Sequence, residues 1–204
     1  MTAMLTHSLE VAAAGLPGVR VLSPRRHRDA RGFFSEVWRE DALRDAGIDA
    51  RFVQENHALS HAAGTVRGLH FQIGQSAQAK LIRCPRGSIL DVSVDIRRGS
   101  PSFGRHAAVV LSADNWRQLY VPVGFAHGYC TLEPDSEVIY QVSAYYDPAC
   151  ERGLAWDDPA IGVAWPVTAV TAVLTDKDRA FPRLAALPDY FPFAHYPDGD
   201  ARLG

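Results

Sequence analysis

Hydrophobic and polar residues alternate along several short segments of the chain, the pattern expected of strands with one buried face. The clearest case is 88–96 (SILDVSVDI), in which every second residue from Leu90 onward is aliphatic. Further strands are predicted where β-branched and aromatic residues gather, at 107–111, 118–123, 137–145 and 169–175. Turn-forming residues separate these segments at 85–87, 97–104, 112–115 and 133–136.

One helix is predicted over 40–47, because two acidic residues open it and Gly47 follows where a helix would stop. The last stretch, 181–204, has four prolines and is expected to wrap the surface, with a frayed end. Many short strands at this spacing predict an all-β fold, a jelly-roll barrel or sandwich with a few short helices. The length of 204 residues suits a single domain.

Composition and charge exclude several classes of protein. A hydrophobic content of 47% with 22% charged residues is typical of a globular protein, and the net charge of -2 argues against a nucleic-acid partner. No apolar run is long enough to span a membrane, and the N-terminus does not resemble a signal peptide. The three cysteines have neither zinc-site nor disulfide spacing, so we expect reduced thiols in a cytoplasmic protein.

Three ionisable residues interrupt apolar strand patterns: His70 in GLHFQ, Lys80 in QAKLI and Tyr140 in VIYQV. Such groups cost free energy among apolar neighbours unless something uses or satisfies them. His70 could be a metal ligand, a core residue or a base. A metal site on a strand would favour a second histidine two positions on, and Gln72 stands there.

A base that removes a carbon-bound proton needs a partner that orients its ring, a donor for the enolate oxygen and an acid that returns a proton. Lys80 and Tyr140 are candidates for the last two roles. Each also has a structural interpretation, Lys80 as an edge residue and Tyr140 as a core aromatic. Spacing alone does not bring them together, so the core and base interpretations of His70 both stay open.

The order of several longer motifs resembles that of the dTDP-4-dehydrorhamnose 3,5-epimerase family, from about residue 19 to about 182. The motifs are DARGFFSEVW (29–38), FVQENHALS (52–60), VRGLHFQ (66–72), AQAKLIRCPRGSILDVSVDIRRGSPSFG (77–104), VPVGFAHGYCTL (121–132), VIYQVSAYYDP (138–148), RGLAWDDPAIGVAWP (152–166) and LTDKD (174–178). Two departures are a QIGQSAQ loop after LHFQ and a threonine in LTDKD where the family has serine. The loop change is expected to affect the choice of sugar or nucleotide more than the catalytic residues.

The resemblance implies a cupin-type jelly roll that needs neither metal nor cofactor and forms a homodimer, with dTDP-4-keto-6-deoxyglucose as substrate. It implies inversion at C3 and C5, both next to the C4 ketone. His70 would be the base, Asp178 its orienting partner, Lys80 the group that stabilises the enolate oxygen, and Tyr140 the acid on the opposite face of the sugar.

The resemblance also implies binding roles. Arg31 and Arg67 would hold the diphosphate, Tyr146 would stack on thymine, and Asp91 would stand behind the site and set the tautomer of His127. The remaining positions that would contact nucleotide or sugar are Glu36, Gln54, Asn56, His127, Glu151 and Lys177. If a dimer swaps its N-terminal strands, Arg31 would reach the partner's site.

Arg67 and His70 are three residues apart, so a regular strand would place them on opposite faces. Both are needed in one pocket, and we therefore predict a bulge or twist near Gly68. Three alternatives to the double epimerase remain: a mono-epimerase acting at C3 or C5 alone, a non-catalytic sugar-nucleotide-binding cupin and a metal-dependent cupin oxygenase.

Overall fold

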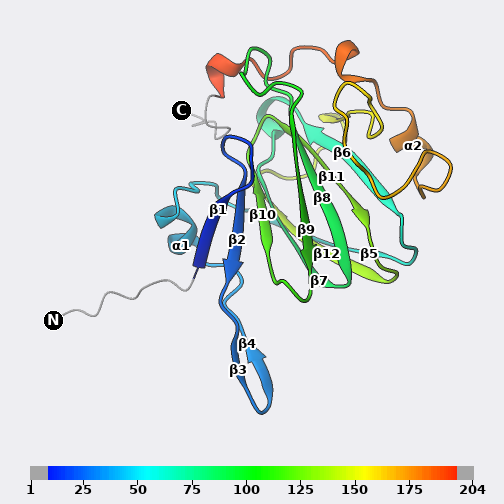
Figure 1. Cartoon of the computed structure of the whole chain (residues 1–204). Coiled ribbons are helices and arrows are strands. Elements are labelled where there is room, and N and C mark those ends of the chain that lie inside the picture. Colours follow the sequence, from blue (N-terminus) through cyan, green and yellow to red (C-terminus); the bar gives the residue numbers. More distant parts are fainter. Residues whose placement is uncertain (1–8, 197–204) are drawn as a thin grey trace.

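Two antiparallel β-sheets pack face to face in the computed structural model, which describes residues 9–196 (Figure 1). The larger sheet contains, in spatial order, β1 (Leu9–Ala13), β2 (Arg20–Pro24), β10 (Gln118–Val121), β7 (Lys80–Arg86), β12 (Ser136–Val142) and β5 (Gln54–Ser60). The smaller contains β13 (Glu151–Gly153), β6 (Val66–Gln72), β11 (Phe125–Thr131), β8 (Ser88–Asp95) and β9 (His106–Ser112). The predicted all-β jelly-roll sandwich is confirmed.

A separate hairpin, β3 (His27–Asp29) and β4 (Gly32–Phe34), projects away from the sandwich (Figure 1). The helices are short: α1 (Glu40–Asp45), α2 (Asp176–Arg179), and the 3-10 helices η1 (Gly74–Ser76), η2 (Leu184–Ala186) and η3 (Phe193–His195). The helix predicted over 40–47 is therefore confirmed as α1. No helix in the part of the chain described is long and apolar enough to cross a membrane.

Four of the five predicted strand segments contain strands, β8, β9, β10 and β12. The prediction over 169–175 is wrong: there, Val173 alone forms an isolated bridge, with Thr65. The β-branched residues of this segment face solvent, and Ala172 is its one buried residue. The residues of this segment favour a strand, but their side chains do not cover a sheet face.

Apolar side chains from both sheets fill part of the space between them. They include Ile82, Leu119 and Val138 from the larger sheet and Leu111 and Phe125 from the smaller. The outer face of the smaller sheet is covered by the chain that follows β13, up to residue 196, as expected for a wrapping segment. The predicted frayed end falls partly on 197–204, outside the described residues. The rest of the space between the sheets is lined by ionisable and other polar side chains together with a few apolar ones.

Candidate active site

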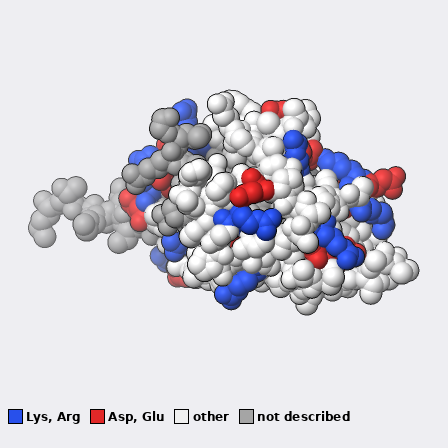
Figure 2. Space-filling view, turned by 90° about the horizontal axis from the view of Figure 1, so that it is seen from above, with Lys and Arg blue, Asp and Glu red and all other residues white. Residues whose placement is uncertain are grey.

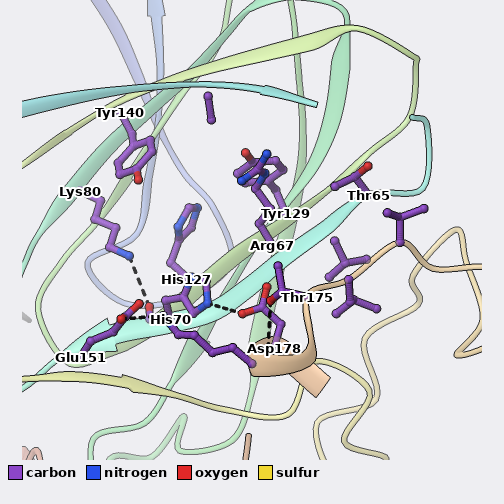
Figure 3. A pocket seen from close by; sticks show the side chains of 15 residues that line it. Thr65, Arg67, His70, Lys80, His127, Tyr129, Tyr140, Glu151, Thr175 and Asp178 are labelled. Carbon is purple, nitrogen blue, oxygen red and sulfur yellow. Dashed lines mark hydrogen bonds and ion pairs between the residues drawn. The ribbon is translucent and has the colours of Figure 1, made fainter. Parts of the chain in front are cut away.

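A cavity of about 530 Å³ opens between the two sheets (Figure 3). Polar side chains reach it from both sheets and from α2: Arg67 and His70 on β6, Lys80 on β7, His127 and Tyr129 on β11, Tyr140 on β12, Glu151 on β13, and Lys177 and Asp178 on α2. A hollow of about 310 Å³ shares four of these residues and adds Gln54, Asn56, Gln72 and Tyr146. Most of the site residues predicted from the sequence therefore line one connected region.

His70 and Asp178, 108 residues apart, meet in this cavity. Nε2 of His70 lies 2.7 Å from Oδ1 of Asp178, which is 4% exposed (Figure 3). Burial alone would raise the pKa of the carboxyl, but the hydrogen bond and charge of His70 outweigh it, and the pKa is lowered. Because a carboxylate can only accept, Nε2 is the nitrogen that donates to Asp178, and Nδ1 is the ring nitrogen left to accept a proton. Thr175 caps α2 and accepts the backbone N–H of Asp178 at 3.2 Å, which fixes the carboxylate in place.

Lys80 is 8% exposed, and its Nζ donates to the backbone carbonyl of His70 at 3.3 Å. Burial lowers the pKa of this amine to about 8, against the opposing influence of Asp91 and Glu151. At neutral pH the cavity therefore still contains an ammonium group next to His70.

Tyr140 faces the cavity from β12, in the sheet opposite His70 (Figure 3). Burial raises the pKa of its phenol. The hydroxyl therefore keeps its proton at neutral pH and can donate it from the wall opposite His70.

His127 and Asp91 form a second buried pair. The Nε2 atom of His127 lies 2.9 and 3.0 Å from the two carboxylate oxygens of Asp91. Burial lowers the pKa of His127, although Asp91 opposes this effect. Asp91 thus occupies the place behind His127 that the sequence interpretation gave it.

Arg67 and His70 lie on the same side of β6 because the strand is bulged. His70 pairs with His127 and Arg67 with Tyr129, so the two residues between them on β6 lie opposite one residue on β11, Gly128. Gly68, between them, has φ +121°, and a Cβ at this position would lie 2.7 Å from Cα of Gly128. The predicted bulge is confirmed.

Glu151 organises the mouth of the site. Its Oε2 accepts Nζ of Lys177 at 2.6 Å and the hydroxyl of Tyr146 at 2.8 Å. Burial would raise the pKa of Glu151, but these two hydrogen bonds outweigh it and lower the pKa. Gln54 accepts the backbone N–H of Tyr146 at 3.0 Å and donates to Asn56 at 2.9 Å, so the predicted binding residues form one network.

Arg31 and Glu36 do not reach the cavity of their own chain. Arg31 lies at the turn of the β3–β4 hairpin, with its side chain 90% exposed and paired with Asp29. Glu36 follows the hairpin, 3.8 Å from Arg39, and lines a small hollow beside α1. Their predicted binding roles are not tested by a single chain.

Tyr129 was missed by the sequence interpretation. The signal was available, since Tyr129 lies two residues after His127 and so shares its face of the strand.

Among residues 9–196, no group of three or more His, Cys, Asp or Glu side chains is placed to hold a metal ion. Figure 2, which looks down on the sandwich, shows acidic and basic side chains mixed on that face.

Comparison with known proteins identifies relatives of this chain. The sequence model of the dTDP-4-dehydrorhamnose 3,5-epimerase family matches residues 13–186. The dTDP-4-dehydrorhamnose 3,5-epimerase of Sinorhizobium fredii is 49% identical over 175 residues, covering 86% of this chain and 89% of its own.

Solved structures agree. The crystal structure of the epimerase from Bacillus anthracis with TDP and PPi bound has a TM-score of 0.83 at 44% identity, over 86% of this chain and 99% of that one. ChmJ, a 3'-monoepimerase from Streptomyces bikiniensis solved with dTDP-quinovose, has a TM-score of 0.77 at 37% identity, over 82% and 84%. The chain belongs to the dTDP-4-dehydrorhamnose 3,5-epimerase family.

Proposed function

We propose that the protein inverts C3 and C5 of dTDP-4-keto-6-deoxy-D-glucose and so forms dTDP-4-keto-L-rhamnose, without a cofactor. The observation that carries this proposal is the His70–Asp178 pair on one wall of a cavity whose opposite wall presents Tyr140. Protons on carbons next to a ketone can be removed if the resulting enolate is stabilised. Inversion further requires that the proton leaves one face and returns to the other.

Each residue then has a defined task. Nδ1 of His70 removes the proton from C3 or C5, while Asp178 holds the ring and stabilises the imidazolium that forms. The ammonium of Lys80 stabilises the negative charge that develops on the C4 oxygen. Tyr140 returns a proton to the opposite face of the same carbon, and solvent exchange resets both groups before the second inversion.

Substrate binding follows from the surrounding polar groups. Arg67 suits the oxygens of the diphosphate, and the network of Gln54, Asn56 and Glu151 leads from the cavity toward Tyr146, which is exposed and free to stack on the base. Lys177 adds positive charge at the mouth, and His127, held by Asp91, contacts the sugar. A nucleotide sugar of this kind is expected in the cytoplasm.

Two chains are proposed to complete each site. Arg31 and Glu36 lie on or beside a hairpin that projects from its own sandwich (Figure 1), which suits a homodimer in which they contact the substrate in the partner's cavity. A mass in solution equal to a single chain would refute the dimer.

The second candidate is a mono-epimerase. It is kept because ChmJ, described as a 3'-monoepimerase, is 37% identical to this chain. In a mono-epimerase, His70, Lys80 and Tyr140 would invert one carbon only. The two functions differ in whether the sugar can shift in the site so that a second carbon reacts.

The test is incubation with dTDP-4-keto-6-deoxyglucose in D2O, with the C3 and C5 protons followed by NMR. The 3,5-epimerase predicts loss of both signals, and His70→Ala should abolish both losses. Loss of one signal would establish the mono-epimerase. Binding without exchange at either carbon would refute both and leave a sugar-nucleotide-binding protein.

A further inference from the structure

Gln72, the last residue of β6, joins two loops at the mouth of the site. Its side chain is 3% exposed, and it lines the smaller hollow together with His70. The side-chain amide donates to the backbone carbonyls of Ser76 at 2.7 Å and Tyr145 at 3.1 Å, and its oxygen accepts the backbone N–H of Asp147 at 2.7 Å. Both polar atoms of this side chain are therefore used by backbone groups of the protein.

Two of these three hydrogen bonds hold the peptide groups on either side of Tyr146. Tyr146 lies in the segment between β12 and β13 and is 54% exposed, so burial contributes little to fixing its ring. Segments of this kind are more mobile than the strands that they connect. Leaving a buried polar group unpaired costs more free energy than its hydrogen bond gains, so Gln72 opposes any rearrangement of the backbone around Tyr146.

The loop that contains η1 supports the same arrangement. It belongs to the QIGQSAQ stretch that departs from the family pattern, and in it Ser76 donates its hydroxyl to a carboxylate oxygen of Asp147 at 3.3 Å. Gln72 lies two residues after His70 on β6, which is about 7 Å along the strand. The backbone on both sides of Tyr146 is thereby fixed relative to the strand that carries the proposed base.

We propose that Gln72 is a positioning residue, which holds Tyr146 in the orientation that stacks on the base of the nucleotide and keeps that base at a fixed distance from His70. The inference rests on the proposed function, in which Tyr146 stacks on the base. Gln72 does not need to touch the substrate, because both of its polar atoms are already hydrogen-bonded. Its effect should therefore pass through Tyr146 and change the affinity for the nucleotide more than the chemical step.

The test is a double-mutant cycle on the affinity for dTDP, measured by calorimetry. Tyr146→Ala should weaken binding about 10-fold or more, through the loss of one stack between base and aromatic ring. Gln72→Leu should weaken binding about 3- to 10-fold, because the ring must then be ordered when the nucleotide binds. In the Tyr146→Ala background, Gln72→Leu should have no further effect, since no ring is left to position.

Ser136→Ala is the matched control. The buried hydroxyl of Ser136 likewise contacts three backbone groups, which belong to Ser88 and Glu133, but it lies at the start of β12 and outside the lining of the cavity. This variant should bind dTDP as wild type does. In steady-state assays with the sugar nucleotide, Gln72→Leu should raise KM about 3- to 10-fold, with kcat within about threefold of wild type.

Equal weakening by Gln72→Leu in both backgrounds would overturn the proposal, because Gln72 would then act on the fold as a whole or on the nucleotide directly. Unchanged dTDP affinity in the single variant would overturn it as well. If Gln72→Leu does not fold, Gln72→Glu takes its place in the cycle, because a carboxylate still accepts the N–H of Asp147 but cannot donate to the two carbonyls.

The cycle also separates this proposal from the proposed function. Wild type that binds dTDP without turning over the sugar nucleotide would refute the proposed function, while the cycle would still decide the role of Gln72. Wild type that does not bind dTDP would refute both.

Discussion

Replacement of Lys80 by methionine should make the protein more stable and at the same time nearly inactive. The side chain is 8% exposed, and within residues 9–196 its ammonium has one hydrogen bond, to the carbonyl of His70 at 3.3 Å. Methionine has nearly the same length and no charge, so it can occupy the space without a desolvation penalty. The loss of the ammonium removes the stabilisation of the enolate oxygen, and kcat should fall about 10²-fold or more.

The pKa of Lys80 sets the size of the stability effect. A fall from 10.5 to about 8 corresponds to about 3 kcal/mol, at about 1.4 kcal/mol for each factor of ten in the proton equilibrium. The lost hydrogen bond offsets about 1 kcal/mol of this, so Lys80→Met should gain about 2 kcal/mol at pH 7. Between about pH 8 and pH 10.5 the unfolded chain binds more protons than the folded one, so the stability of wild type rises there and the gain disappears.

Urea unfolding of both proteins from pH 7 to pH 10.5 tests this reasoning. Lys177→Met is the matched control, because the side chain of Lys177 is 52% exposed and its ion pair with Glu151 should contribute at most about 1 kcal/mol. In wild type, kcat/KM should also fall as the pH rises through about 8, since Lys80 then loses its charge. A Lys80→Met protein that is less stable than wild type at pH 7, or a difference that does not change with pH, would refute the account of a costly buried ammonium.

Three further predictions concern other parts of the site. Asp178→Asn should lower kcat by about 10³-fold or more with little change in KM, because an amide that donates to Nε2 moves the ring proton to Nδ1; kinetics within tenfold of wild type would remove Asp178 from the mechanism. In urea unfolding, Gly68→Ala should lower the free energy of unfolding by about 2 kcal/mol or more, because its Cβ would lie 2.7 Å from Cα of Gly128. Gly74→Ala, at φ +63° with no atom within 4 Å of the new Cβ, should lower it by about 1 kcal/mol. Equal losses of stability in the two variants would contradict the packing argument. Arg31→Ala should raise KM severalfold at constant kcat in steady-state assays, and an unchanged KM would exclude Arg31 from binding.

The parts of the fold that could be predicted from the sequence are those set by local periodicity. The alternation over 88–96 gave β8, and the acidic start and following glycine gave α1. The bulge at Gly68 followed from requiring Arg67 and His70 to share a face. The error at 169–175 has a different cause: β-branched residues were present, but their side chains face solvent instead of a sheet face.

The contacts that make the site could not be read from spacing. His70 meets Asp178 across 108 residues because α2 lies within the segment that follows β13 and wraps the smaller sheet. The family resemblance identified both residues, but only the structure shows which of their atoms form the hydrogen bond. Tyr129 was overlooked because an aromatic residue in an apolar strand is usually core, although its position two residues after His127 places it on the same face of the strand.

The central claim is that His70 acts as base and Tyr140 as acid from opposite walls of the cavity. The Tyr140→Phe variant in D2O tests this claim most directly. His70 should still remove the C3 and C5 protons and return deuterium to the same face, so NMR should show deuterium incorporation with retained configuration and little product. His70→Ala should show neither exchange nor inversion. Inversion by Tyr140→Phe at the wild-type rate would contradict the account, because the returning proton would then have another source.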